Sequence, residues 1–115
     1  MKRLAAGFLI AGALFALAQC ELFSKTVEYA VTAGFGNVTV LYNDENGEGN
    51  AVTTAIPWSV SFDLFSSKRP FAAALRVTNN TGGTVDACIR EEGVNVDEVT
   101  GLAAGSTADL WAWIE

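Results

Sequence analysis

Few side chains of this 115-residue sequence are suited to catalysis, because it contains no histidine. Ser-His-Asp and Cys-His pairs and imidazole metal ligands are therefore absent. The groups whose type and spacing still suggest chemistry are two cysteines, Cys20 and Cys88, and three carboxylates, Asp44, Glu45 and Glu48. From this inventory we expect a protein that is not an enzyme, with no catalytic residues and no cofactor.

Cys20 stands directly after an uncharged run of 15 residues, Leu4 to Ala18, which follows a short basic start. This order is typical of an export signal, and the run is shorter than the roughly 20 residues of a membrane-spanning helix. The segment Leu17 to Cys20 resembles a bacterial lipobox, where a diacylglycerol is attached to the cysteine thiol and the signal is cut before it. Lipoboxes usually have Gly, Ala or Ser at the position of Gln19, so a plain signal peptide cut near Ala18 is the alternative.

The sequence therefore predicts a signal peptide over residues 1–19, a lipidated tether over 20–24 and one domain over 25–115. Cleavage before Cys20 leaves five Lys and Arg against thirteen Asp and Glu, a side-chain charge of −8. Nucleic acid is a poor partner for such a chain, because phosphates are neutralised by Lys and Arg. An anionic membrane would repel it as well, so acyl chains must supply the attachment. We expect a location in the bacterial cell envelope, membrane-anchored at a periplasmic or outer face.

The predicted state of Cys88 depends on whether Cys20 is acylated. If Cys20 is acylated, Cys88 has no partner cysteine, and if Cys20 is not, a Cys20–Cys88 disulfide closes a long loop. By alternation Cys88 shares a polar strand face with Asp86 and Arg90, and a neighbouring arginine can lower a thiol pKa. Without histidine nearby, a partly covered structural thiol is the favoured interpretation over a reactive one.

From Lys25 onward, apolar residues recur at every second position between turn-forming stretches, as in half-buried antiparallel strands. Pro57 cannot donate to a strand ladder and marks an edge or a bulge. We expect an all-β domain, an antiparallel sandwich of about seven strands. The runs are Val27–Ala33, Val38–Tyr42, Ala51–Leu64 interrupted at Pro57, Phe71–Val77, Val85–Arg90, Val94–Val99 and Thr107–Ile114.

The last predicted strand carries the most prominent candidate binding residues. Trp111 and Trp113 share one face of it, and Leu110 and Ile114 share the other. If the aliphatic face is buried, the two indoles form an exposed platform of the kind that contacts a partner or a lipid. The alternative is that the indoles fill the core and the small face is exposed.

Two further features have a structural interpretation. Asp44, Glu45 and Glu48 surround a glycine turn and could share a Ca²⁺, but their spacing does not match an EF-hand loop, so a solvated turn and no metal are predicted. Trp58 continues an apolar strand face after Pro57 and is predicted to anchor the core.

Four segments, taken together, resemble the soluble domain of the MmpS family of small mycobacterial membrane proteins: Val27–Thr32, Val38–Asp44, Ile56–Val60 and Ala87–Ile89. The resemblance implies an immunoglobulin-like β-sandwich outside the cytoplasmic membrane that assists a lipid or siderophore exporter, without catalysis. Family members keep an uncleaved N-terminal helix, where this chain has Cys20. They also pair the cysteine equivalent to Cys88 with one on the last strand, where this chain has none.

The expected function is therefore that of a non-enzymatic envelope lipoprotein, an accessory or binding subunit for a membrane transporter or its lipidic cargo. Its expected contacts are the membrane, through the lipid anchor, and a transporter protein. A free-standing ligand-binding or adhesin-like module on the cell surface is the alternative, because one sandwich fold supports many functions.

Overall fold

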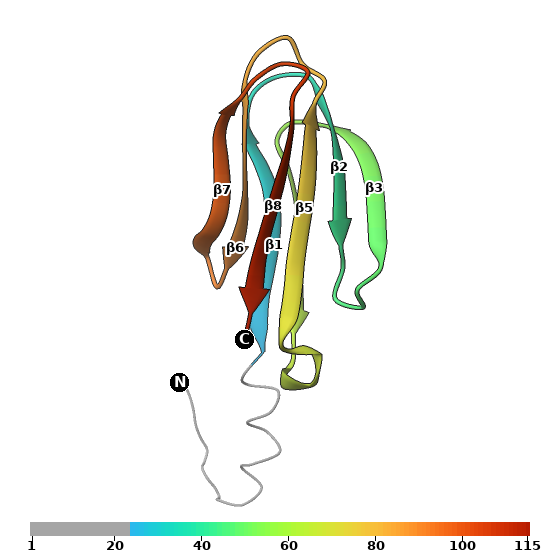
Figure 1. Cartoon of the computed structure of the whole chain (residues 1–115), viewed down its shortest axis with the longest axis vertical. Coiled ribbons are helices and arrows are strands. Elements are labelled where there is room, and N and C mark those ends of the chain that lie inside the picture. Colours follow the sequence, from blue (N-terminus) through green and yellow to red (C-terminus); the bar gives the residue numbers. More distant parts are fainter. Residues whose placement is uncertain (1–23) are drawn as a thin grey trace, which may run out of the picture.

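The computed structural model describes residues 24–115, which form eight strands and one 3₁₀ turn (Figure 1). The predicted signal peptide and Cys20 lie outside the described residues. Within residues 24–115, no helix has the length and apolar character needed to cross a membrane. The elements are β1 (Lys25–Ala33), β2 (Asn37–Asn43), β3 (Gly49–Ala55), β4 (Trp58–Leu64), η1 (Ser66–Lys68), β5 (Phe71–Asn79), β6 (Val85–Glu91), β7 (Val94–Leu102) and β8 (Thr107–Ile114).

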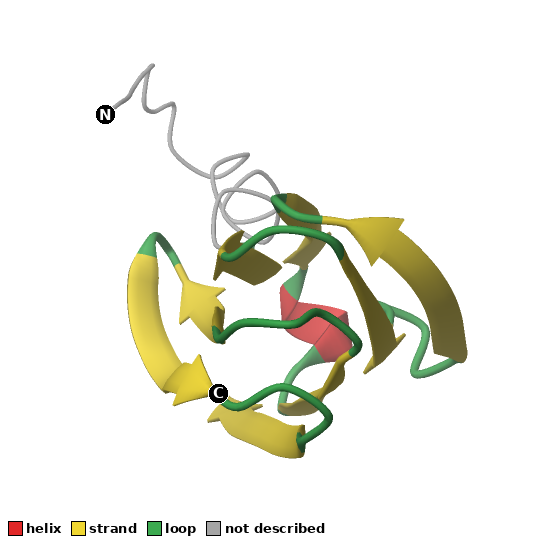
Figure 2. Cartoon of the chain, turned by 90° about the horizontal axis from the view of Figure 1, so that it is seen from above, coloured by secondary structure: helices red, strands yellow, loops and turns green. Residues whose placement is uncertain are grey.

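The strands form two four-stranded antiparallel sheets, in the orders β4-β1-β6-β7 and β3-β2-β5-β8. Seen from above, the two sheets face each other (Figure 2). The predicted all-β sandwich is confirmed, with eight strands where the sequence indicated about seven. The run interrupted at Pro57 makes two strands, because the chain changes sheet there: β3 and β4 are edge strands of different sheets.

The core lies between the sheets and is built from the alternate residues of their inner faces. Each fully buried Leu, Ile or Val contributes about 1.5–3 kcal/mol relative to exposure. Buried side chains include Val27, Tyr29, Val31, Val38, Val40, Leu64, Leu75, Val77, Ile89, Leu110 and Ile114. Asn79 is the fully buried polar residue among those described, and its amide donates to the carbonyls of Gly83 and Leu102 at 2.8 and 2.9 Å.

A row of aromatic rings fills one part of this core. Trp58 contacts Tyr42, Tyr42 contacts Tyr29, and Tyr29 contacts Phe62, each with ring centroids 5.6 Å apart. Such tilted and edge-on pairs are favoured arrangements of aromatic rings. Trp58 is partly buried and packs against the core, so its predicted anchoring role is confirmed.

Candidate functional site

Strand β8 directs its two tryptophans to solvent. Trp111 is 62% exposed and Trp113 is 51% exposed, whereas Leu110 and Ile114 are buried. The interpretation in which the indoles fill the core is therefore wrong. The reason lies in the neighbouring strand: Leu110 and Ile114 pair with Leu75 and Phe71 of β5, which face the core, so the opposite side chains must face outward. Binding by these tryptophans remains a prediction.

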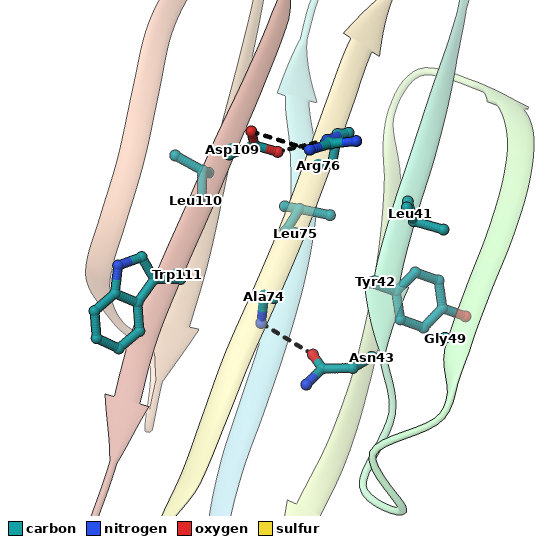
Figure 3. Close-up of a pocket in the computed structure, with 10 residues that line it drawn as sticks. All are labelled: Leu41, Tyr42, Asn43, Gly49, Ala74, Leu75, Arg76, Asp109, Leu110 and Trp111. Carbon is teal, nitrogen blue, oxygen red and sulfur yellow. Dashed lines mark hydrogen bonds and ion pairs between the residues drawn. The ribbon is translucent and has the colours of Figure 1, made fainter.

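The outer face of the sheet β3-β2-β5-β8 carries a shallow groove of about 460 Å³ (Figure 3). Leu41 of β2 and Trp111 of β8 stand on opposite sides of it, and Ala74 of β5 lies between them. The groove exists because the side chain between two large apolar ones is only a methyl group. It is lined by Leu41, Tyr42, Asn43, Gly49, Ala74, Leu75, Arg76, Asp109, Leu110 and Trp111.

An ion pair between Arg76 and Asp109 lies along one side of this groove. The guanidinium Nε is 2.6 Å from Oδ1 of Asp109, and Nη2 is 3.3 Å from Oδ2, so the pair is bidentate. The hydrogen bond from Arg76 lowers the pKa of Asp109, which keeps the carboxylate ionised. The charges of Arg76 and Asp109 compensate each other, so the groove carries no net charge. Its other lining groups are mainly apolar.

Asn43 holds the other end of the groove together at the last residue of β2. Its Oδ1 accepts hydrogen bonds from the Ala74 amide at 2.9 Å and from the Tyr29 hydroxyl at 2.6 Å. Its Nδ2 donates to the Ala72 carbonyl at 2.7 Å. The side-chain amide thus takes the place of a further β2 peptide and binds β5 where β2 ends. Burial raises the pKa of Tyr29, so this phenol stays protonated and remains a donor.

Of the residues that line the groove, sequence reasoning gave a binding role to Trp111 alone. Leu41 and Asn43 are on β2 and Arg76 is on β5, and both strands are far from β8 in the sequence. Only the sheet order brings them to the same face as Trp111. The signal that was available is Asp109, which alternates with the two tryptophans and therefore had to share their exposed face.

The acidic turn after β2 uses its first carboxylate internally. Asp44 accepts hydrogen bonds from the backbone amides of Asn46 and Glu48, at 2.9 and 3.0 Å, and from the Asn50 side chain at 3.1 Å. These bonds, the one from Asn50 first, lower the pKa of Asp44. Within residues 24–115, no three acidic or cysteine side chains come together as metal ligands would. Asp44 therefore shapes the hairpin.

Cys88 is a buried free thiol on β6, only 4% exposed. Burial raises its pKa and outweighs the opposing effect of Arg90, whose guanidinium is paired with Glu28 at 3.0 Å. The thiol is therefore held protonated, which contradicts the reactive-thiol hypothesis and agrees with a structural role. Cys20, the other possible disulfide partner, lies outside the described residues.

The tryptophans lie toward the end of the sandwich where the described chain begins. In Figure 1 the C-terminus, at the end of β8, is at the same end of the molecule as the start of β1. Trp113 is next to the last residue of β8, and Trp111 lies about 10 Å from the end of the strand at about 3.3 Å per residue.

Comparison with known proteins gives this chain no family. No protein-family model matches it, and no curated protein matches it either. The class of protein that the fold and the groove define is therefore the most specific description available: an all-β sandwich with an apolar groove on the outer face of one sheet.

Proposed function

We propose that this chain is a non-enzymatic, lipid-anchored protein of the bacterial cell envelope that binds lipidic cargo, or the transporter that moves it, at the groove between Leu41 and Trp111. The observation that carries the proposal is the exposure of Trp111 at an apolar groove, together with the exposure of Trp113 on the same face of β8. Large exposed apolar patches on a soluble domain are characteristic of contact sites for partners, ligands or membranes.

The energy available from covering the tryptophans supports this proposal. An indole side chain buries about 150–250 Å², and Trp111 and Trp113 are still 62% and 51% exposed. Covering both removes roughly 170–280 Å² from water, which at about 25 cal/mol per Å² corresponds to about 4–7 kcal/mol before the costs of association. A micromolar Kd corresponds to about 8 kcal/mol, so other contacts in the groove must supply the remainder and also offset the costs of association.

The lining of the groove favours an apolar ligand over a charged solute. Its charged side chains, Arg76 and Asp109, are already paired with each other. A charged ligand would have to compete with this bidentate pair, whereas an acyl chain or an apolar side chain only has to cover Leu41, Ala74 and Trp111. The Arg76 and Asp109 pair can also bind a polar headgroup at the side of the groove.

The position of the groove fits attachment through Cys20. Four residues, Glu21 to Ser24, separate Cys20 from Lys25 at the start of β1. An acylated Cys20 would therefore hold the end of the sandwich that carries Trp113 next to the membrane. Tryptophan is enriched where protein meets the interface of a bilayer. The resemblance to the MmpS family, whose members assist exporters, supports the same assignment.

The proposal is tested by cross-linking in intact membranes, with the wild-type chain and a Cys20→Ser variant, followed by identification of what is bound. We expect a transporter subunit or a lipid to be recovered with the wild type, and less of it with the variant. A mass measurement of the N-terminal peptide checks the anchor. Recovery of neither a transporter nor a lipid with either form contradicts the proposed function, and a binding partner recovered equally with both forms favours a free-standing binding module.

A further inference from the structure

We propose that the end of the sandwich opposite the start of β1 is a protein-binding surface, with Phe35 as its anchor and the water-exposed part of a partner protein as its ligand. The surface is formed by the four connections at that end, residues 34–36, 56–57, 80–84 and 103–106, which we call the loop end (Figure 1). The inference rests on the proposed function in one respect, because attachment through Cys20 sets the direction in which the loop end points. It assigns the protein partner to a surface separate from the groove.

The four connections of the loop end contain no charged side chain, although the sequence is acidic overall. The central parts of protein interfaces are depleted in charged residues, because an ionised group that is covered without a partner loses its hydration. The loop end can be covered completely without that cost, and the surface that fits it is itself uncharged. The connections at the opposite end, in contrast, carry charges of both signs: Asp44, Glu45, Glu48, Lys68, Arg69 and Glu92.

Phe35 projects from the loop end between two glycines. Its side chain is 92% exposed, the largest fraction among the exposed large apolar residues of the described chain. Both neighbours have left-handed backbone angles, with φ of +126° at Gly34 and +102° at Gly36. A Cβ atom on Gly34 would lie 2.9 Å from the Thr84 carbonyl oxygen, so this close packing admits only glycine and holds the phenyl ring outward. Aromatic residues, phenylalanine among them, are enriched in the centres of interfaces.

Hydrogen bonds link the four connections into one surface. The Ile56 amide donates to the Gly36 carbonyl at 3.1 Å, which joins the connection after β3 to the one after β1. The side-chain amide of Asn79 donates to the carbonyls of Gly83 and Leu102, at 2.8 and 2.9 Å, and so joins the connection after β5 to the start of the one after β7. A surface that is already held in its binding shape loses less conformational freedom on association.

The chemistry of the loop end favours a protein over a glycan as the partner. A glycan is recognised through hydrogen bonds to its hydroxyl groups, and polar side chains at this end already bond within the chain. The Asn80 amide donates to the Thr39 hydroxyl at 2.9 Å, and the Thr81 hydroxyl donates to the Asn79 side chain at 2.7 Å. A phenyl ring, in contrast, gains most from an enclosing apolar pocket, because the hydrophobic effect scales with the apolar area that is covered. Such pockets are found in folded proteins.

The position of the anchor places this partner in the aqueous phase. The described chain begins at the end of the sandwich that is remote from the loop end (Figure 1). A nine-residue strand such as β5 is about 30 Å long, whereas the four residues from Glu21 to Ser24 span about 14 Å at most. A chain acylated at Cys20 therefore cannot direct its loop end at the same bilayer. The partner that Phe35 meets is a protein domain outside the membrane, such as the water-exposed part of a transporter.

The test uses the full chain in its own cells, with a benzophenone cross-linking side chain at Thr84, which is exposed and lies against the Phe35 turn. We expect a cross-link to one polypeptide other than this chain. Phe35→Ser should reduce that product by about tenfold or more, whereas the matched control Phe35→Leu, which keeps an apolar side chain, should reduce it by no more than about threefold. Both variants should melt close to the wild type, because Phe35 is exposed.

A charge placed in the loop end gives a second test. Gly82 is exposed, and a Cβ atom there would meet no other atom within 4 Å, so Gly82→Glu and its uncharged control Gly82→Gln should both fold. We expect the glutamate alone to reduce the product, by about tenfold or more, because it would be covered in its ionised form by an uncharged surface. Equal effects of the two substitutions would overturn the uncharged character of the partner surface.

Several outcomes would overturn the loop-end proposal: a product that survives Phe35→Ser or is lost equally in Phe35→Leu, a link between two copies of the chain, a product that is a lipid or a glycan, or no product at all. The same label at Trp113 reports separately on the groove. A product at Trp113 without one at Thr84 contradicts the loop-end proposal alone. A product at Thr84 without one at Trp113 contradicts the binding site named in the proposed function and leaves the loop end supported.

Discussion

Replacing Asn43 with alanine should weaken the fold by about 2–4 kcal/mol, a large effect for a residue at the end of a surface strand. The Asn43 amide makes three hydrogen bonds: with the Tyr29 hydroxyl, the Ala74 amide and the Ala72 carbonyl. Tyr29 is fully buried, and a buried hydroxyl without an acceptor costs about 1–3 kcal/mol. The two backbone bonds to β5 are closer to solvent and add about 0.5 kcal/mol each.

Urea unfolding at 25 °C of a secreted Cys20→Ser chain measures this loss. With a slope of about 1.5 kcal/mol per M for a domain of this size, the midpoint should fall by roughly 1.3–2.7 M in Asn43→Ala. The slope itself should not change, because the substitution removes no strand. A change below about 0.5 kcal/mol would refute the view that the Asn43 amide replaces a peptide of β2.

A double-mutant cycle with Tyr29→Phe separates the hydroxyl from the backbone bonds. Tyr29→Phe alone should cost about 0.5–1.5 kcal/mol, since it removes a hydrogen bond without leaving a buried donor unsatisfied. In the double variant the orphaned hydroxyl is absent, so the combined loss should be at least about 1 kcal/mol smaller than the sum of the single losses. Strict additivity would show that the 2.6 Å contact between Tyr29 and Asn43 does not contribute as we propose.

Three further predictions follow from the exposed and the buried side chains. The double substitution Trp111→Ser and Trp113→Ser should leave the melting temperature within a few degrees of the wild type while weakening ligand or partner binding at least tenfold, as measured by titration calorimetry. Loss of the fold would contradict the exposed placement of the indoles. Cys88 should react with a thiol reagent at pH 8 much more slowly in the native chain than in urea, because burial raises its pKa, and equal rates would contradict that burial. Because its pKa is lowered in the folded state, Asp44 stabilises the fold above about pH 4, and this stabilisation is lost as the pH falls through the folded-state pKa. Asp44→Asn should therefore flatten the acid side of the plot of unfolding free energy against pH. An unchanged plot would contradict the role of Asp44 in the turn.

Much of the fold was predictable from local patterns. Alternation of Val27, Tyr29 and Val31 gave the inner face of β1, and Pro57 indicated where strand pairing had to be interrupted. What alternation did not show is that Pro57 separates strands of two different sheets. That depends on which edges the rest of the chain leaves open, and alternation along a single strand does not show which sheet the strand joins.

The candidate site was predictable only in part, and for a similar reason. The spacing of Trp111 and Trp113 showed that they share a face, but two faces of β8 were both apolar enough to be buried. Pairing with β5 decided the question, because Leu75 and Phe71 are inside and their partners on β8 must be inside too. A strand has no preferred face until its neighbours define the core.

The sequence by itself determined the absence of histidine chemistry, the all-β character and the acidic surface, since these depend on composition and on spacing of two along the chain. Only the tertiary structure decided that Leu41, Ala74 and Trp111 form one groove and that the Asn43 side chain bonds to the first residues of β5. Each of these relations joins residues at least 29 positions apart, and strand pairing within one sheet brings them together.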